Sequence, residues 1–89
     1  MRDIAAISNF LKENPKAKEM LLYLIDNSDD NGVLKCSYFD IADALGLSFP
    51  IISRTITAIK GFGLATVSSS DTSHIYLVDK KLRSVLENI

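Results

Sequence analysis

The chain has 89 residues, of which 47% are hydrophobic and 24% are charged, a composition typical of one soluble globular domain. Its formal net charge of −1 argues against a generic polyanion-binding protein. A single cysteine excludes an internal disulfide bond and fits a reducing compartment. No apolar run approaches the roughly 20 residues of a membrane span, and no secretory signal is visible. We therefore expect a cytoplasmic protein that does not enter a membrane.

The first part of the chain predicts two helices and a strand. Apolar residues recur at helical spacing over residues 3–13, and a stronger apolar face runs over residues 16–27. Asn14 is placed to cap the second helix, and Pro15 suits its first turn because a proline nitrogen has no hydrogen to donate. Residues 33–36 form a short apolar run that predicts a strand.

A short helix is predicted over residues 38–45. Ser37 and Asp40 have the spacing of a capping box, although glutamate or glutamine is commoner at the second position. The helix is expected to bury one of its two aromatic residues, Tyr38 or Phe39.

A longer helix follows after a tight turn. Gly46 is expected to end the preceding helix in a left-handed conformation. Ser48 is placed to cap the next helix, which runs to about residue 60. The side chains expected to face inward from this helix are Ile52, Ile56 and Ile59.

The last part of the chain predicts a hairpin and a final helix. The apolar period changes to that of strands at residues 64–67 and 74–78, with an all-polar loop at residues 68–73 between them. Asp79 is placed to cap a last helix with an apolar stripe. The predicted order is therefore α-α-β-α-α-β-β-α, and Cys36 is expected to be a small buried hydrophobe.

Several dipeptides occur at the spacing found in one family of DNA-binding proteins. They are Ile-Ala at 41–42, Leu-Gly at 45–46, Ser-Arg at 53–54 and Gly-Leu at 63–64. Over roughly residues 15–78 the chain resembles the winged helix-turn-helix DNA-binding proteins, and among them the MarR-type regulators and the plasmid replication proteins. The resemblance implies a mostly α, α+β fold in one domain, residues 1–89, with the hairpin as the wing and helices added at both ends.

In that family the second helix of the pair, here residues 48–60, lies in the major groove of DNA. The residues on its outer face, which we take as the candidate DNA-binding residues, are Ser48, Phe49, Pro50, Ser53, Arg54, Thr57 and Lys60. Arg54 is expected to read a base, since a guanidinium group matches guanine O6 and N7. Lys60 is expected to contact the backbone, and Ser53 and Thr57 a phosphate or a base edge.

Two of these residues leave alternatives open. Ser48 and the helix N-terminus offer N–H groups to a phosphate. Phe49 could touch a thymine methyl group, although we favour packing within the protein. Residues 44–70 contain no acid, but the predicted wing contains no lysine or arginine to grip the minor groove.

The interpretation is a sequence-specific binder of double-stranded DNA that needs no cofactor or metal, acting as a transcriptional regulator or as a plasmid or viral replication or segregation factor. With so few cations in each subunit, useful affinity requires two half-sites and hence a homodimer. Residues 1–14 and 79–89 are the expected dimerisation helices. The alternative is a winged helix used only for protein interaction. One histidine, one cysteine and no phosphate-binding loop argue against an enzyme.

Overall fold

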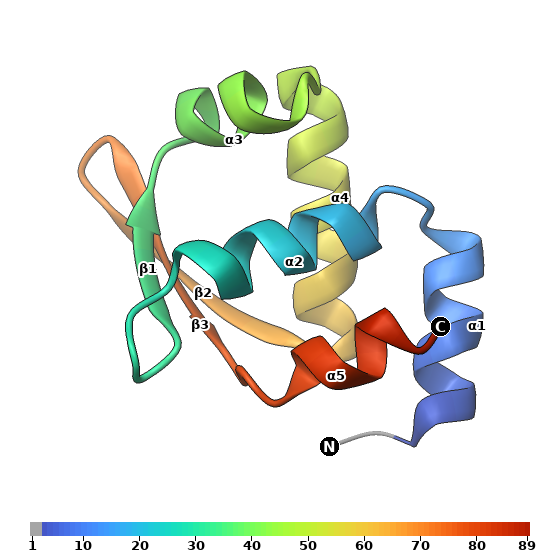
Figure 1. The fold of residues 1–89 in the computed structure, drawn as a ribbon. Helices are drawn as coiled ribbons and strands as arrows, with labels where there is room; N and C mark the ends of the chain where they lie inside the picture. The colour runs from blue at the N-terminus through green and yellow to red at the C-terminus, as the bar shows by residue number, and fades with distance from the viewer. Residues whose placement is uncertain (1–2) are drawn as a thin grey trace.

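The computed structural model describes residues 3–89, so residues 1 and 2 of the segment 1–14 lie outside the described residues. The order of helices and strands is the predicted one. The elements are α1 (Ile4–Glu13), α2 (Ala17–Asn27), β1 (Val33–Cys36), α3 (Tyr38–Leu45), α4 (Phe49–Phe62), β2 (Ala65–Ser70), β3 (Ser73–Val78) and α5 (Leu82–Glu87). Figure 1 shows a small sheet on one side and helices over the rest of the molecule, which confirms a mostly helical α+β fold. Among residues 3–89 no helix is long and apolar enough to cross a bilayer.

The three strands form an antiparallel sheet in the order β1-β3-β2. β2 and β3 are longer than predicted, because the serines between them pair across the strands, as Ser70 does with Ser73. The predicted loop over residues 68–73 is thus wrong, and only Asp71 and Thr72 form the turn. Strands are paired by hydrogen bonds between backbone groups, which every residue here provides, so a run of polar side chains does not exclude a strand.

The core is built around α2, which crosses the middle of the molecule and packs against α4, α5 and β3 (Figure 1). Its apolar side chains are buried as the periodicity predicts, with Met20 and Leu21 wholly inaccessible to solvent. The sheet adds Tyr76, also wholly buried, from its central strand. Burial of each large side chain of this kind stabilises the fold by about 1.5–3 kcal/mol.

The helices at the two ends belong to this same core. On α1 the side chains of Ile7 and Leu11 are buried, and the ring of Phe10 stacks on that of Phe62 at 4.5 Å between centroids. On α5 the predicted stripe is buried at Leu82 and Leu86. The expectation that these stripes lie outside the core is therefore wrong for Ile7, Leu11, Leu82 and Leu86, while Ile4 and Ile89 remain 62% and 37% exposed.

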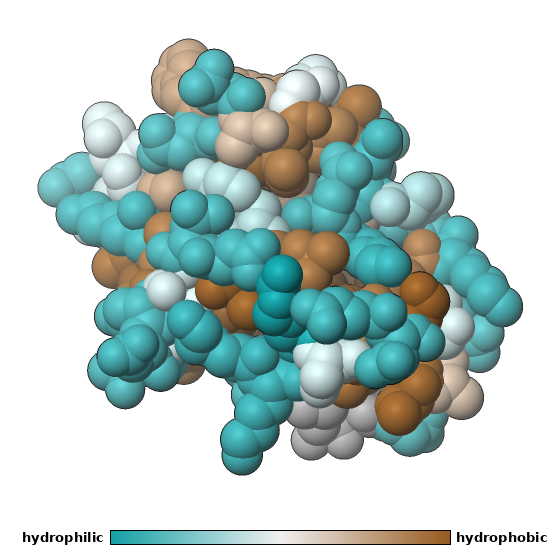
Figure 2. All heavy atoms as spheres, viewed as in Figure 1, coloured by the Kyte–Doolittle hydropathy of each residue, from teal (hydrophilic) through white to brown (hydrophobic). Residues whose placement is uncertain are grey.

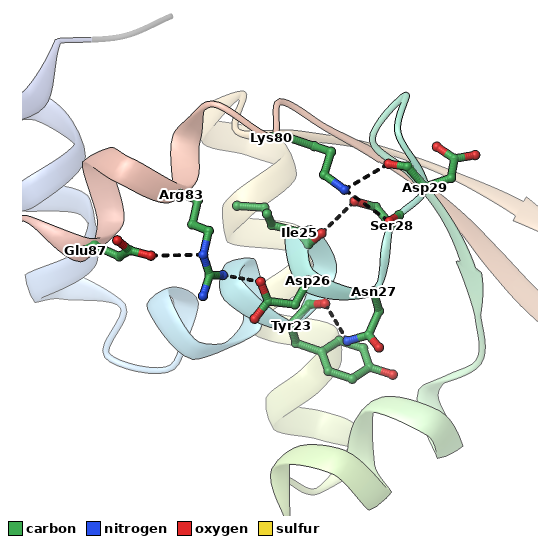
Figure 3. A network of polar contacts seen from close by, with 9 residues as sticks. All are labelled: Tyr23, Ile25, Asp26, Asn27, Ser28, Asp29, Lys80, Arg83 and Glu87. Atoms are coloured by element: carbon green, nitrogen blue, oxygen red, sulfur yellow. Dashed lines mark hydrogen bonds and ion pairs between the residues drawn. The ribbon is translucent and has the colours of Figure 1, made fainter.

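Polar contacts also join α5 and the residues just before it to α2 and to the loop after α2 (Figure 3). The guanidinium group of Arg83 pairs with the carboxylate of Asp26 and, through Nε, with Glu87 Oε1 at 2.9 Å. Lys80 Nζ donates to the carbonyl oxygens of Ser28 and Asp29 at 3.2 and 3.1 Å. These cations are therefore already engaged within the protein.

Two of the predicted helix caps outside α3 and α4 differ in the structure. Asn14 does not cap α2; its Nδ2 donates to the carbonyl oxygen of Phe10 at 3.0 Å and so closes the end of α1, leaving Lys16 in the capping position of α2. Asp79 accepts a hydrogen bond from the Lys81 amide at 2.9 Å, one turn before α5 begins. The last carbonyls of a helix compete for the same short polar side chains as the first amides of the next.

Candidate nucleic-acid interface

The pair α3 and α4 is set by local sequence features. Ser37 and Asp40 form the predicted capping box, in which the Ser37 amide donates to Asp40 Oδ2 at 2.9 Å and the Asp40 amide to Ser37 Oγ at 3.2 Å. Gly46 ends α3 with a φ of 68°, a conformation that glycine adopts without strain. α4 then begins after Ser48 and extends past Gly61 to Phe62, slightly beyond the predicted end.

One face of α4 anchors it in the protein. Ile52, Ile56 and Ile59 are buried as predicted, at 0%, 5% and 1% exposure, and Thr55 beside them is 8% exposed. Because this stripe occupies one side of the helix along its length, the opposite side points to solvent.

The outer face of α4 carries every predicted contact residue. All of them are exposed: Ser48, Phe49, Pro50, Ser53, Arg54, Thr57 and Lys60. At about 100° of rotation per residue, Thr57 lies near the middle of this face, and Ser53 lies between Thr57 and the edge that carries Lys60. Arg54 lies at one edge, beside the α1–α2 turn, and Lys60 at the other, beside the base of the hairpin. The face therefore carries Thr57 and Pro50 near its centre and one cation toward each edge.

Hydrogen bonding limits what two of these residues offer to a ligand. The hydroxyl of Thr57 donates to the carbonyl oxygen of Ser53 at 2.8 Å, so it is left as an acceptor. Ser48 occupies the capping position of α4, but its side chain makes no capping hydrogen bond, contrary to the prediction. Pro50 has no N–H, so the first turn offers the amides of Phe49 and Ile51 to an anion.

An aromatic cluster lies where α3 and α4 both begin. Of the two aromatic residues that α3 could bury, Tyr38 is half-buried against the core, whereas Phe39 is 74% exposed. Its ring meets that of Phe49 edge to face, at 4.8 Å between centroids. Phe49 is 40% exposed and also contacts Tyr38, which stacks on His74 of β3 at 4.7 Å. A helical projection places residue 39 opposite the buried Ile41, so the exposure of Phe39 could have been found from the sequence.

Hydrophobic residues reach the surface at this end of the molecule. In the view of Figure 2 they gather over α3 and the adjoining end of α4, whereas hydrophilic residues cover most of the surface over α2 and α5. The hairpin does not extend the positive charge, since β2, β3 and the turn between them contain no lysine or arginine.

A second group of polar side chains, from β1 and β3, lies inside the protein. Cys36 is 6% exposed, as predicted, and burial, with a smaller contribution from Asp40, raises the pKa of its thiol to about 11. The thiol is therefore protonated at neutral pH. His74 Nδ1 and the Tyr76 hydroxyl are buried nearby without hydrogen-bond partners. Within residues 3–89 no three His, Cys, Asp or Glu side chains come together to hold a metal ion.

One residue beside the interface was missed by the sequence analysis. Lys16 lines the same surface depression as Arg54, although the two belong to different helical segments. Nothing in the local sequence around Lys16 indicates this proximity, because it depends on how the α1–α2 turn packs beside α4. Neither Lys16 nor Arg54 makes an ion pair with any residue in the described part of the chain.

Comparisons with protein-family models, with curated proteins and with solved structures give no significant match to this chain.

Proposed function

We propose that this chain is a winged helix-turn-helix protein that binds double-stranded DNA with the outer face of α4 in the major groove. The observation that carries the proposal is that this face is exposed along its whole length and carries one cation toward each edge, Arg54 on one side and Lys60 on the other. The major groove, about 12 Å wide, admits one α-helix, with a phosphate backbone along each side of it. A helix that carries a cation toward each edge is complementary to that arrangement.

The surroundings of α4 agree with this proposal. The β2–β3 hairpin follows α4 directly in the chain, where a wing is expected, and it completes a sheet of order β1-β3-β2. No acidic residue occurs from residue 44 to residue 70, so α4 and the turn before it present no carboxylate to DNA. Because the hairpin lacks cations, its role is to support α4, and the cations of α4 supply the electrostatic attraction to DNA.

We further propose that two copies bind adjacent half-sites. Arg54 and Lys60 alone give each copy few phosphate contacts, and affinity for DNA rises with the number of phosphates neutralised. The buried stripes of α1 and α5 are not available for this pairing, so the two copies meet through other surfaces. Such a protein acts in the cytoplasm as a transcriptional regulator or as a plasmid or viral replication or segregation factor, roles that share this binding activity.

A specific observation favours one other function, a protein-interaction module. The exposed rings of Phe39 and Phe49 lie beside the exposed acids Asp40 and Asp43 of α3. Exposed aromatic pairs are common at protein interfaces. The experiment below separates the two functions.

The substitution Thr57→Glu tests the proposal, because it places a carboxylate at the centre of the face. Binding to labelled duplex DNA, measured by fluorescence anisotropy at low salt, is expected to weaken about tenfold or more, through repulsion from the phosphates. The fold is expected to persist, since Thr57 is exposed and glutamate favours helix more than threonine does.

The matched control is Ser84→Glu, which adds the same charge to an exposed position of α5. It is expected to bind nearly as tightly as the parent. Equal weakening by both substitutions would mean that only net charge matters, which contradicts a role for α4. A parent protein that does not bind duplex DNA even at low salt would favour the protein-interaction module.

A further inference from the structure

A surface depression of about 250 Å³ lies where the α1–α2 turn meets the side of α4. It is bounded by residues from two parts of the chain that are far apart in sequence. These residues are Glu13, Asn14, Pro15, Lys16, Ile51, Arg54 and Thr55. The depression adjoins the outer face of α4 along the edge that carries Arg54.

The charges around the depression favour an anion with a single negative charge. Lys16 and Arg54 are cations, and Glu13 is the one acid among the lining residues, which leaves one net positive charge. None of these three side chains makes an ion pair with a residue in the range 3–89. Lys16 also stands at the start of α2 without a side-chain cap, where the helix dipole adds positive potential. A phosphodiester group carries one negative charge and matches this balance.

The position of Arg54 agrees with a backbone contact. Arg54 lies about 60° around the helix axis from Thr57, which is near the centre of the outer face, on the side away from Ser53. A side chain at that angle points toward the wall of the major groove, where the phosphates run, when Ser53 and Thr57 face the bases. This differs from the role expected for Arg54 from sequence, that of reading a base.

We infer that the depression between Lys16 and Arg54 binds a phosphate of the DNA backbone, so that the α1–α2 turn extends the interface beyond α4. The inference rests on the proposed function. It adds Lys16 to the binding residues and assigns Arg54 to the backbone, leaving the base edges to the centre of α4. The carboxylate of Glu13 would oppose this binding, because it reduces the affinity of the depression for a phosphate.

The test uses a pool of random-sequence duplexes, on which phosphate contacts dominate, and measures how the dissociation constant depends on salt. Lys16→Ala is expected to lower the magnitude of the log–log salt slope by about 0.9, the value for one lost phosphate contact. Glu13→Gln is expected to tighten binding by about twofold to fivefold, as for removal of an exposed repulsive charge. Arg54→Ala is expected to weaken binding to all sequences alike.

The control is Lys81→Ala, which removes an exposed lysine at the start of α5, the helix that packs on α2. If Lys16→Ala and Lys81→Ala have the same salt slope while Thr57→Glu still weakens binding, the phosphate site is wrong and the proposed function stands. If the parent does not bind the duplex pool, the proposed function fails and this inference fails with it. A change of sequence preference in Arg54→Ala would indicate that Arg54 contacts a base and not the phosphate.

Discussion

Replacing Gly32 by alanine is expected to destabilise the fold by about 3 kcal/mol or more, measured as the free energy of unfolding in denaturant. The φ of Gly32 is +80°, and a Cβ at this position would lie 2.0 Å from the carbonyl oxygen of Val78. The two residues are also joined by a hydrogen bond of 2.9 Å from the Val78 amide to the Gly32 carbonyl oxygen. The backbone at β3 cannot move away without breaking this bond.

Two other glycines serve as controls for that substitution. Gly46 also has a positive φ, +68°, but a Cβ there would meet no atom within 4 Å. Gly46→Ala is therefore expected to cost only about 1 kcal/mol, the strain of a left-handed alanine. Gly61 lies within α4 in open space, and Gly61→Ala is expected to stabilise the fold by about 0.5–1 kcal/mol. Equal losses for Gly32→Ala and Gly46→Ala would contradict the close contact with Val78.

Leu86→Ala is expected to lower the free energy of unfolding by about 2–5 kcal/mol, because the side chain is fully buried and its removal leaves a cavity. The loss is expected to be the same at all protein concentrations, since Leu86 packs within its own protomer. Denaturant unfolding at several concentrations measures both quantities. The control is Ile4→Ala, at a position 62% exposed, which is expected to change stability by less than about 0.5 kcal/mol.

The concentration dependence separates two structures for the terminal helices. A loss that grows larger as the protein concentration rises would indicate that Leu86 is buried between two copies, because only the parent would gain the full stabilisation from pairing. That result would restore the dimerisation role first assigned to residues 79–89. A constant loss supports a protomer in which α5 is an integral part of the core.

The sequence was most informative where a local pattern decides the structure. The isoleucine stripe of α4, the capping box at Ser37 and the left-handed Gly46 all depend on neighbours within a few residues. The exposed face of α4 follows from the same stripe, so the candidate DNA-binding residues could be named before the fold was known.

The sequence was least informative where the structure depends on distant segments. The apolar pattern of α5 does not show whether Leu86 packs against α2 or against a second copy, because either partner would bury the side chain equally well. Likewise, Asn14 fits the end of α1 and the start of α2, and only packing decides between them. Lys16 joins Arg54 through the path of the α1–α2 turn, which no local pattern encodes.

Amide chemical-shift mapping by NMR, during titration of the isotope-labelled protein with duplex DNA, would locate the DNA-binding surface residue by residue. Salt-sensitive shifts are expected to concentrate at the exposed positions of α4, from Phe49 to Lys60, and at Lys16 beside it. Little change is expected on α5 and the residues just before it, because their cations Arg83 and Lys80 are engaged within the protein. Shifts confined to the aromatic cluster at Phe39, to the outer face of the sheet or to α5, or no shifts at low salt, would contradict a DNA interface on α4.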